Sequence, residues 1–298
     1  MLERLVRIEN EHARALVYPE QGFQLHAFAV KVDGRWIDVV YGPSDGHEPA
    51  DRRYGNPVLF PSAGVTTGAE PDRWAHGGRL LPMQQHGWAR DAYWHVETIA
   101  RDAVSAGLRP TTGMRVAFPF DFALHLRYAL EGDTLALDAE LTNVGAMAFP
   151  YALGFHPYLR APLASDGDRA ACVVRLPAGT RLRTPDAWRT IERSPSPARA
   201  LGAVDAELPG SIVLVETGAA ALEVEDPAAR LAARVAVEQR APFQSFPTWV
   251  AWTAAPDAPY VCLEPWTDAP NALNRSTTRT IEPGAAHRYR TTISARAL

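Results

Sequence analysis

The 298-residue sequence predicts an all-β protein of the sandwich or barrel class, and three observations lead to that class. Apolar residues alternate with polar ones in several short segments, which is the two-residue period of a strand with one buried face. The 25 prolines and 21 glycines are spread along the chain and indicate many turns. The strand patterns follow one another without the intervening helices of a βαβ fold. Because no repeat or change of composition marks a boundary, we expect one domain over residues 1–298.

The N-terminal part of the chain contains three short strand patterns. They lie at residues 13–19 (ARALVYP), 24–30 (QLHAFAV) and 36–42 (WIDVVYG). Turn residues separate them, among them Asp33 and Gly34, and such residues are typical of hairpin connections. We therefore expect these strands to be antiparallel neighbours.

The clearest element is a long hairpin predicted within residues 115–143. On its first strand, one face carries the apolar side chains Phe122, Leu124, Leu126, Tyr128 and Leu130. After a turn at residues 131–133, the alternation resumes with Leu135, Leu137, Ala139 and Leu141. A helix would need apolar residues three and four positions apart, and that spacing fits these residues less well.

The later part of the chain contains further strand patterns and few helical ones. Strands are predicted at residues 211–216, 221–226 and 233–239, and the alternating residues 287–298 predict a last one. The segment PAARLAAR at residues 227–234 is the strongest candidate for a short helical turn.

Composition excludes several classes of function. With 47% hydrophobic and 21% charged residues, the chain can bury an ordinary globular core. Its net charge of -4 provides no basic surface for nucleic acid or an anionic membrane. No run of about 18 apolar residues predicts a membrane span, and residues 1–17 lack the apolar core of a secretory signal, so we expect a cytoplasmic protein. Cys172 and Cys262 lack the number for a disulfide framework and the spacing of a zinc site, so we expect both to be reduced.

Residues 81–94, LPMQQHGWARDAYW, form the first segment that does not resemble plain scaffold. His86 is followed there by Gly87, and a glycine lets a loop backbone approach a ligand closely. The alternative for an isolated His-Gly pair is a surface histidine in a turn.

The second such segment is LGFHPYLR at residues 153–160. His156 lies between Phe155 and Pro157, so its backbone is restricted and its imidazole is partly desolvated. An imidazole titrates near neutral pH, and a fixed one can donate or accept a proton. The alternative is a histidine that packs and hydrogen-bonds at the end of a strand.

The third segment is YVCLEPWTDAPNALN at residues 260–274. In a strand, Tyr260, Cys262 and Glu264 share one face, which places a carboxylate among apolar groups. Burial raises the pKa of a carboxyl group and makes it a better base while it stays ionised. The alternative is a glutamate at a strand end that faces water.

Taken in order, LPMQQHGWARD, LGFHPYL and VCLEPWTDAPNALN resemble motifs of the aldose 1-epimerase (galactose mutarotase-like) family. Similar stretches at residues 55–64, 118–130 and 246–253 extend the resemblance over nearly the whole chain, and residues 161–240 are its least similar part. The resemblance implies a single large antiparallel β-sandwich, the galactose mutarotase-like supersandwich, with an open cleft for a monosaccharide. It also implies an isomerase that interconverts the anomers of a free aldose without a metal or an organic cofactor.

The resemblance implies roles for individual residues. His156 matches the general acid that protonates the ring oxygen, and Glu264 matches the general base that removes the proton from the anomeric hydroxyl. His86 matches a position that hydrogen-bonds the sugar. Trp88 and Trp266 are candidates for stacking on the sugar, and the alternative for each is a place in the core.

The chain departs from the family pattern at Val65, where many members carry an arginine that binds sugar hydroxyls. Arg90 and Arg73 are the candidate replacements. The absence of that arginine keeps a second class of function open, a sugar-binding or regulatory protein without catalysis.

Two enzymatic alternatives also follow from the residues. A hexose-6-phosphate 1-epimerase would use the same acid and base but needs a cationic phosphate site, for which Arg52 and Arg53 are candidates, although they also suit a solvated surface. A polysaccharide-cleaving enzyme is disfavoured, because no second carboxylate pairs convincingly with Glu264. The sequence predicts neither the preferred sugar nor the oligomeric state.

Overall fold

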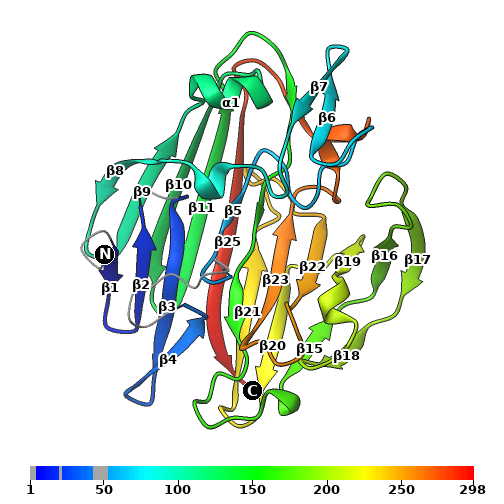
Figure 1. Cartoon of the computed structure of the whole chain (residues 1–298). Helices are drawn as coiled ribbons and strands as arrows, with labels where there is room; N and C mark the ends of the chain where they lie inside the picture. Colours follow the sequence, from blue (N-terminus) through cyan, green and yellow to red (C-terminus); the bar gives the residue numbers. More distant parts are fainter. Residues whose placement is uncertain (1–4, 20–21, 43–52) are drawn as a thin grey trace.

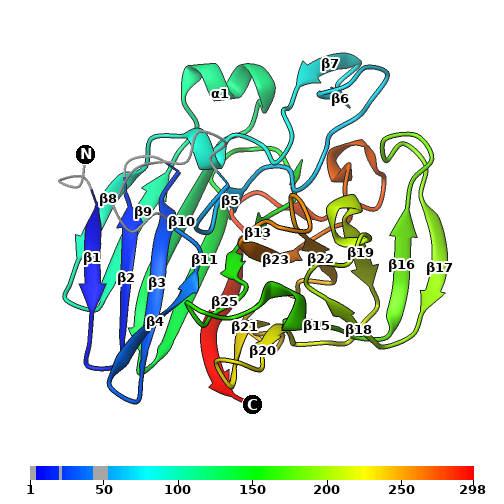
Figure 2. The ribbon, with the colours of Figure 1, turned by 60° about the horizontal axis from the view of Figure 1, so that its bottom comes forward.

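The computed structural model describes residues 5–19, 22–42 and 53–298, which consist mostly of β-strands and their connections (Figure 1). Within these ranges α1 (Thr112–Ala117) is the only α-helix. Two large antiparallel sheets lie face to face, as Figures 1 and 2 show from two directions. This arrangement confirms the predicted all-β antiparallel sandwich.

The larger sheet has twelve strands, and ten of them form the path β1-β2-β3-β4-β14-β23-β22-β19-β16-β17. Their bounds are β1 (Val6–Glu9), β2 (Ala13–Tyr18), β3 (Gln24–Val32), β4 (Arg35–Val40), β14 (Tyr158–Arg160), β23 (Tyr260–Trp266), β22 (Thr248–Trp252), β19 (Ile212–Val215), β16 (Gly179–Arg183) and β17 (Glu192–Ser196). Two short strands, β5 (Val58–Leu59) and β13 (Gly154–Phe155), pair beside this path.

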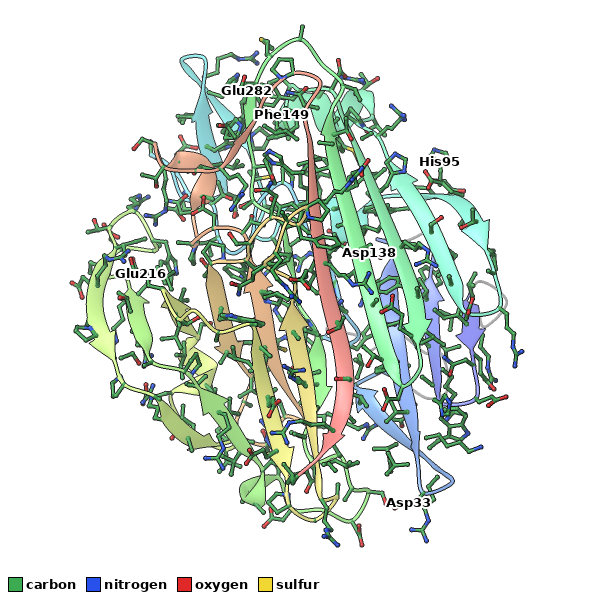
Figure 3. The ribbon with its side chains drawn as sticks, turned by 180° about the vertical axis from the view of Figure 1, so that it is seen from behind. Asp33, His95, Asp138, Phe149, Glu216 and Glu282 are labelled. Carbon is green, nitrogen blue, oxygen red and sulfur yellow. The ribbon has the colours of Figure 1, made fainter. Side chains whose placement is uncertain are left out.

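The second sheet has nine strands in the order β18-β15-β20-β21-β25-β11-β10-β9-β8. Their bounds are β18 (Arg199–Gly202), β15 (Val173–Leu176), β20 (Ala221–Asp226), β21 (Leu231–Val237), β25 (Ala286–Ala297), β11 (Thr134–Asn143), β10 (Phe122–Glu131), β9 (Ala103–Leu108) and β8 (His95–Ile99). Figure 3 shows this sheet from behind, with Asp138 of β11 labelled.

Smaller elements connect the two sheets. Two pairs of strands form ribbons, β6 (Arg73–His76) with β7 (Arg79–Pro82) and β12 (Phe149–Pro150) with β24 (Thr280–Ile281). Single turns of 3-10 helix occur at η2 (Ala89–Asp91), η3 (Arg169–Ala171), η4 (Leu208–Gly210) and η5 (Ala272–Asn274).

The predicted strands are confirmed along the chain. The three N-terminal patterns correspond to β2, β3 and β4, which pair as antiparallel neighbours in that order. Strands β10 and β11 form the long hairpin, in register from Phe122 opposite Asn143 to Glu131 opposite Thr134. The connecting turn is therefore Gly132 and Asp133, one residue shorter than predicted. The later patterns correspond to β19, β20, β21 and β25.

The structure differs from the sequence analysis in its helices at two places. Residues 227–230 form the turn of a hairpin, and β21 then begins at Leu231, so the PAARLAAR segment contains no helix. Asp226 stabilises this turn because its Oδ1 accepts the backbone N–H of Ala228 at 2.9 Å. The sequence did not predict α1, which begins after Thr111, whose hydroxyl accepts the N–H of Met114 at 3.2 Å.

Strand β23 separates the core of the sandwich from the opposite face of the larger sheet. Val261 and Leu263 belong to the core between the two sheets, together with buried residues of β10 and β25. Tyr260, Cys262 and Glu264 point to the other face, as the alternation of the sequence predicts. All seven residues of β23 are buried, because side chains and loops also cover that second face.

Candidate active site

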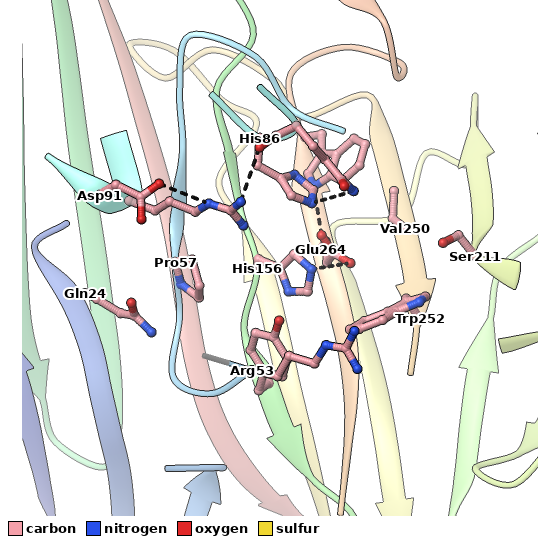
Figure 4. A pocket seen from close by; sticks show the side chains of 14 residues that line it. Gln24, Arg53, Pro57, His86, Asp91, His156, Ser211, Val250, Trp252 and Glu264 are labelled. Atoms are coloured by element: carbon pink, nitrogen blue, oxygen red, sulfur yellow. Dashed lines mark hydrogen bonds and ion pairs between the residues drawn. The ribbon is translucent and has the colours of Figure 1, made fainter. Parts of the chain in front are cut away.

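A cavity of about 370 Å³ opens on the face of the larger sheet that points away from the core (Figure 4). It is lined by Gln24, Arg53, Pro57, Gln85, His86, Arg90, Asp91, His156, Tyr158, Ser211, Val250, Trp252, Glu264 and Trp266. The lining includes five of the six residues that the sequence predicts as catalytic or sugar-binding, namely His86, Arg90, His156, Glu264 and Trp266. Three sequence motifs far apart in the chain therefore meet at one site.

Strand pairing brings His156 to Glu264. On one side of His156, Gly154 of β13 pairs with Trp266, and on the other side, Tyr158 of β14 pairs with Cys262. His156 lies midway between these two pairs, directly opposite Glu264 in the same register. Nε2 of the imidazole lies 3.4 Å from Oε1 of the carboxylate, as the dashed line in Figure 4 marks.

Burial controls the charge of this pair. His156 is 7% exposed and Glu264 is 2% exposed. Burial, aided by the charge of Arg90, lowers the pKa of His156 to about 3. Burial also raises the pKa of Glu264 well above its usual value, and the hydrogen bond from Trp266 lowers it again in part. Both shifts disfavour the charged forms, so burial favours a proton on the carboxyl group of Glu264 and a neutral imidazole at His156.

His86 is held in one tautomer by the backbone of Gly64. The N–H of His86 donates to the carbonyl oxygen of Gly64 at 2.8 Å, and the N–H of Gly64 donates to Nδ1 of the imidazole at 3.1 Å. Since a backbone N–H can only donate, Nδ1 is the acceptor and the ring proton lies on Nε2. Burial and the charges of His156 and Arg90 lower the pKa of His86 well below its usual value. His86 is thus a neutral hydrogen-bond donor.

The room that Gly87 provides is used by the protein itself. A Cβ at Gly87 would lie 2.2 Å from the carbonyl oxygen of Phe60, and the residue has a φ of 66°. The N–H groups of Trp88 and Ala89 both donate to that same oxygen at 3.1 Å. The close approach predicted for this glycine is therefore to the backbone of Phe60, and it fixes the loop that carries His86.

Two arginines reach the cavity from different elements. Arg90 of η2 donates from Nη2 to the carbonyl oxygen of Gln85 at 3.3 Å, and its Nε lies 3.7 Å from Oδ2 of Asp91. The guanidinium of Arg53 lies over the ring of Trp252, with its central carbon 5.7 Å from the ring centroid. Arg52 lies outside the described residues.

The two candidate tryptophans occupy different environments. Trp266 is 4% exposed, lines the cavity and lies edge-on to His86, with ring centroids 5.8 Å apart. Trp88 does not line this cavity. Its ring stacks on Phe122 of β10, with centroids 5.8 Å apart, and packs against the core of the sandwich. For Trp88, therefore, the alternative of a place in the core holds.

The family-typical arginine position is not part of the lining either. Neither Val65 nor Arg73 belongs to the lining of the cavity, whereas Arg90 does. Of the two candidate replacements, the structure therefore brings only Arg90 to the site.

Sequence reasoning missed several lining residues, including Gln24, Asp91 and Trp252. The signal for Asp91 was its place beside Arg90 in the same motif. Trp252 alternates with Val250 along β22 and so shares the cavity face, which only the position of β22 beside β23 reveals.

Over residues 5–19, 22–42 and 53–298, no cluster of three or more His, Cys, Asp and Glu side chains is arranged to hold a metal ion. In the same ranges, no helix has the length and apolar character needed to cross a membrane.

Comparisons with known proteins agree with this architecture. The sequence model of the family described as aldose 1-epimerase matches residues 4–294. Protein LacX, encoded on a plasmid of Lactococcus lactis subsp. lactis, is 23% identical over 248 residues, which cover 75% of this chain and 78% of LacX.

Solved structures with the same fold cover nearly the whole chain. The Slr1438 protein from Synechocystis sp. PCC 6803 superposes with a TM-score of 0.80 at 23% identity, over 99% of this chain and 96% of that chain. A galactose mutarotase related enzyme from Lactobacillus acidophilus also gives a TM-score of 0.80, at 19% identity, over 98% of this chain and 97% of that chain.

Proposed function

Because this chain belongs to the aldose 1-epimerase family, we propose that it is an isomerase that interconverts the α and β anomers of a free aldose. The observation that carries the proposal is the buried pair of His156 and Glu264, whose facing atoms lie 3.4 Å apart in a cavity of about 370 Å³. That volume is in the range of small-molecule sites, and the pair provides one acid and one base at a single point.

In the ring-opening step, Glu264 is the base and His156 is the acid. The carboxylate takes the proton of the anomeric hydroxyl, and the electrons of that O–H bond form the carbonyl at C1. The bond between C1 and the ring oxygen breaks, and the ring oxygen keeps its electrons and takes the proton from Nε2 of His156. Rotation about the C1–C2 bond exposes the other face of the carbonyl. Reclosure on that face, with both proton transfers reversed, gives the other anomer.

The scheme conserves the proton count of the pair. Before ring opening the single proton is on His156 and Glu264 is ionised, and afterwards Glu264 is protonated and His156 is neutral. Burial favours the second, uncharged state through the lowered pKa of His156 and the raised pKa of Glu264. Transfer of the anomeric proton to Glu264 is therefore favourable within the pair, whereas the charged state must form again before each ring opening.

His86 complements the pair as a neutral donor. Its ring centroid lies 5.4 Å from that of His156, Nδ1 accepts the N–H of Gly64, and Nε2 faces the cavity 3.3 Å from the side-chain amide nitrogen of Gln85. A hydrogen bond from the Nε2–H of His86 to an oxygen of the sugar would stabilise negative charge without supplying a proton that could be lost. We include Arg90 and Trp266 in the substrate-binding set because both line the cavity, and we leave Trp88 out.

The test is the rate at which freshly dissolved α-D-glucose and α-D-galactose reach anomeric equilibrium, followed by polarimetry or proton NMR. We expect an acceleration proportional to protein concentration. If the sugars bind, as seen by calorimetry, but equilibrate at the spontaneous rate, the protein is a sugar-binding or regulatory protein instead.

A second candidate is a hexose-6-phosphate 1-epimerase, and the observation that favours it is the presence of Arg53 and Arg90 in the lining of the cavity. Guanidinium groups bind phosphate well. The same assay with glucose 6-phosphate separates the two candidates, because only the second predicts a clear preference for the phosphorylated sugar.

A further inference from the structure

We propose that Arg90, together with Asp91, recognises the hydroxymethyl group that hexoses carry on C5, so that the enzyme prefers hexoses to pentoses and to 6-phosphorylated hexoses. This inference rests on the proposed function, because it uses the positions of the acid and the base to orient the sugar. It adds to that function a class of substrate and the residues that select it.

The acid and the base determine which end of the sugar faces Arg90. The anomeric oxygen lies at Glu264 and the ring oxygen lies at His156. In a pyranose the ring oxygen joins C1 to C5, so C5 and its substituent lie beyond the ring oxygen, away from the anomeric oxygen. In Figure 4, Asp91 and Glu264 lie on opposite sides of His156. The C5 substituent therefore extends toward Asp91 and its neighbour Arg90.

The field of Arg90 agrees with this placement. Its positive charge contributes to the lowered pKa of both His86 and His156. The guanidinium thus lies near enough to both imidazoles to act on the side of the pair where the ring oxygen binds.

Arg90 and Asp91 are held in place by their own contacts. Arg90 donates to the carbonyl oxygen of Gln85 at 3.3 Å and pairs with Asp91 at 3.7 Å. Asp91 also accepts a hydrogen bond from Nε2 of Gln84 at 2.9 Å. The N–H of Gly22, at the turn before β3, donates to the carbonyl oxygen of Ala92 at 2.8 Å and ties this segment to the sheet. The pair is therefore preorganised.

The chemistry of the pair suits a hydroxyl group. A guanidinium only donates and a carboxylate only accepts, whereas a hydroxyl does both. A pentose offers the pair no partner, and a 6-deoxyhexose offers a methyl group. A 6-phosphate is attracted by Arg90 but brings its negative charge beside Asp91, so the carboxylate disfavours it.

The experiment compares D-galactose with two analogues. L-Arabinose has the same ring without C6, and D-fucose is the 6-deoxy form of D-galactose. For Arg90→Met we expect the ratio of kcat/KM for D-galactose to that for either other sugar to fall roughly 10–100-fold, as expected for a lost hydrogen bond to a charged group. Because each ratio is measured on one preparation, partial unfolding of a variant cancels.

Arg53→Met is the matched control, because it removes another cation of the same cavity on the side of Trp252. It should change kcat/KM for the three sugars by the same factor. For Asp91→Asn we expect the ratio of kcat/KM for glucose 6-phosphate to that for glucose to rise by about 10-fold, since one repulsive charge is removed. Equal losses on all three sugars in Arg90→Met would overturn the inference while leaving the epimerase function intact. If the unaltered protein accelerates no sugar, the proposed function itself fails.

Discussion

Trp266 donates its indole N–H to Oε2 of Glu264 at 3.2 Å, so this ring holds the proposed base as well as lining the cavity. The ring has little freedom to move. A Cβ at Gly64 would lie 2.9 Å from Cζ3 of the indole, and Gly64 also fixes His86. Gly64 thus contacts both Trp266, which holds the proposed base, and His86, the neutral donor.

The first prediction concerns this hydrogen bond. Trp266→Phe keeps most of the ring but removes the N–H that lowers the pKa of Glu264. We expect kcat/KM to fall by about 10-fold or more, because a hydrogen bond to a charged group is worth about 1.5–3 kcal/mol. The active pair holds one proton, and removing the N–H raises the pH at which the pair loses that proton. The alkaline limb of the pH profile should therefore move to higher pH.

The matched control for that variant is Trp88→Phe. The indole Nε1 of Trp88 is buried and has no hydrogen-bond partner in the described part of the chain, and the ring lies outside the cavity lining. Its loss should leave the pH profile in place. A profile that moves equally in both variants would contradict the role given to Trp266.

The second prediction tests the acid and the base directly. His156→Gln and Glu264→Gln should each lower kcat by about 10²–10⁴-fold, the usual contribution of a positioned proton-transfer group. The double variant should be little slower than the slower single variant, because the two residues act as one unit. Both substitutions leave a neutral side chain in a buried site, so far-UV circular dichroism should show an unchanged fold. Full activity in either single variant would remove that residue from the mechanism.

The third prediction is the pH dependence of stability that the two buried histidines produce. Both have a pKa below the usual 6.5 in the folded protein. The unfolded chain therefore binds protons below pH 6.5 that the folded protein does not bind. Stability is complete above that pH and decreases as the pH falls toward the folded-state values, by up to about 1.4 kcal/mol per pH unit for each histidine.

Urea unfolding at several values between pH 7.5 and pH 5 measures this dependence. The raised pKa of Glu264 acts in the opposite sense, because stability from that group decreases as the pH rises above the usual carboxyl value. The difference between the unaltered protein and His86→Gln cancels the contribution of Glu264. That difference should shrink as the pH falls, and a constant difference would contradict a neutral His86.

The fourth prediction concerns Asp226, which is 1% exposed and is not part of the cavity lining. One of its oxygens accepts the N–H groups of Leu163 and Ala164 at 2.8 and 2.9 Å, and the other accepts those of Ala228 and Ala229 at 2.9 and 3.3 Å. Asp226→Ala leaves these donors without their acceptor and should lower the free energy of unfolding by about 3 kcal/mol or more.

Asp226→Asn keeps one carboxyl-like oxygen and should cost less than Asp226→Ala in the same urea titration. Glu216→Ala provides the surface comparison, because its partner Arg193 and Glu216 itself are both exposed, and it should change stability by less than about 1 kcal/mol. Equal effects of Asp226→Ala and Glu216→Ala would show that the four N–H groups do not depend on Asp226.

Local pattern was sufficient for most of the fold. The alternation from Phe122 to Leu141 predicted the hairpin because side chains on a strand point to its two faces in turn, whatever the strand pairs with. The segment at residues 227–234 failed because alanine, arginine and leucine suit a helix as well as a strand. There the pairing of β20 with β21 decided the outcome. The one-domain organisation over residues 1–298 stays a prediction.

The sequence by itself determined which residues carry reactive groups, since His86, His156 and Glu264 lie in motifs that resemble one family. It could not determine what those groups face. Trp88 and Trp266 are the same residue type, and each lies in one of these motifs, yet Trp88 packs against the core and Trp266 lines the cavity. Only the tertiary structure set His156 opposite Glu264, because the contact depends on the register of β13 and β14 against a strand about a hundred residues away.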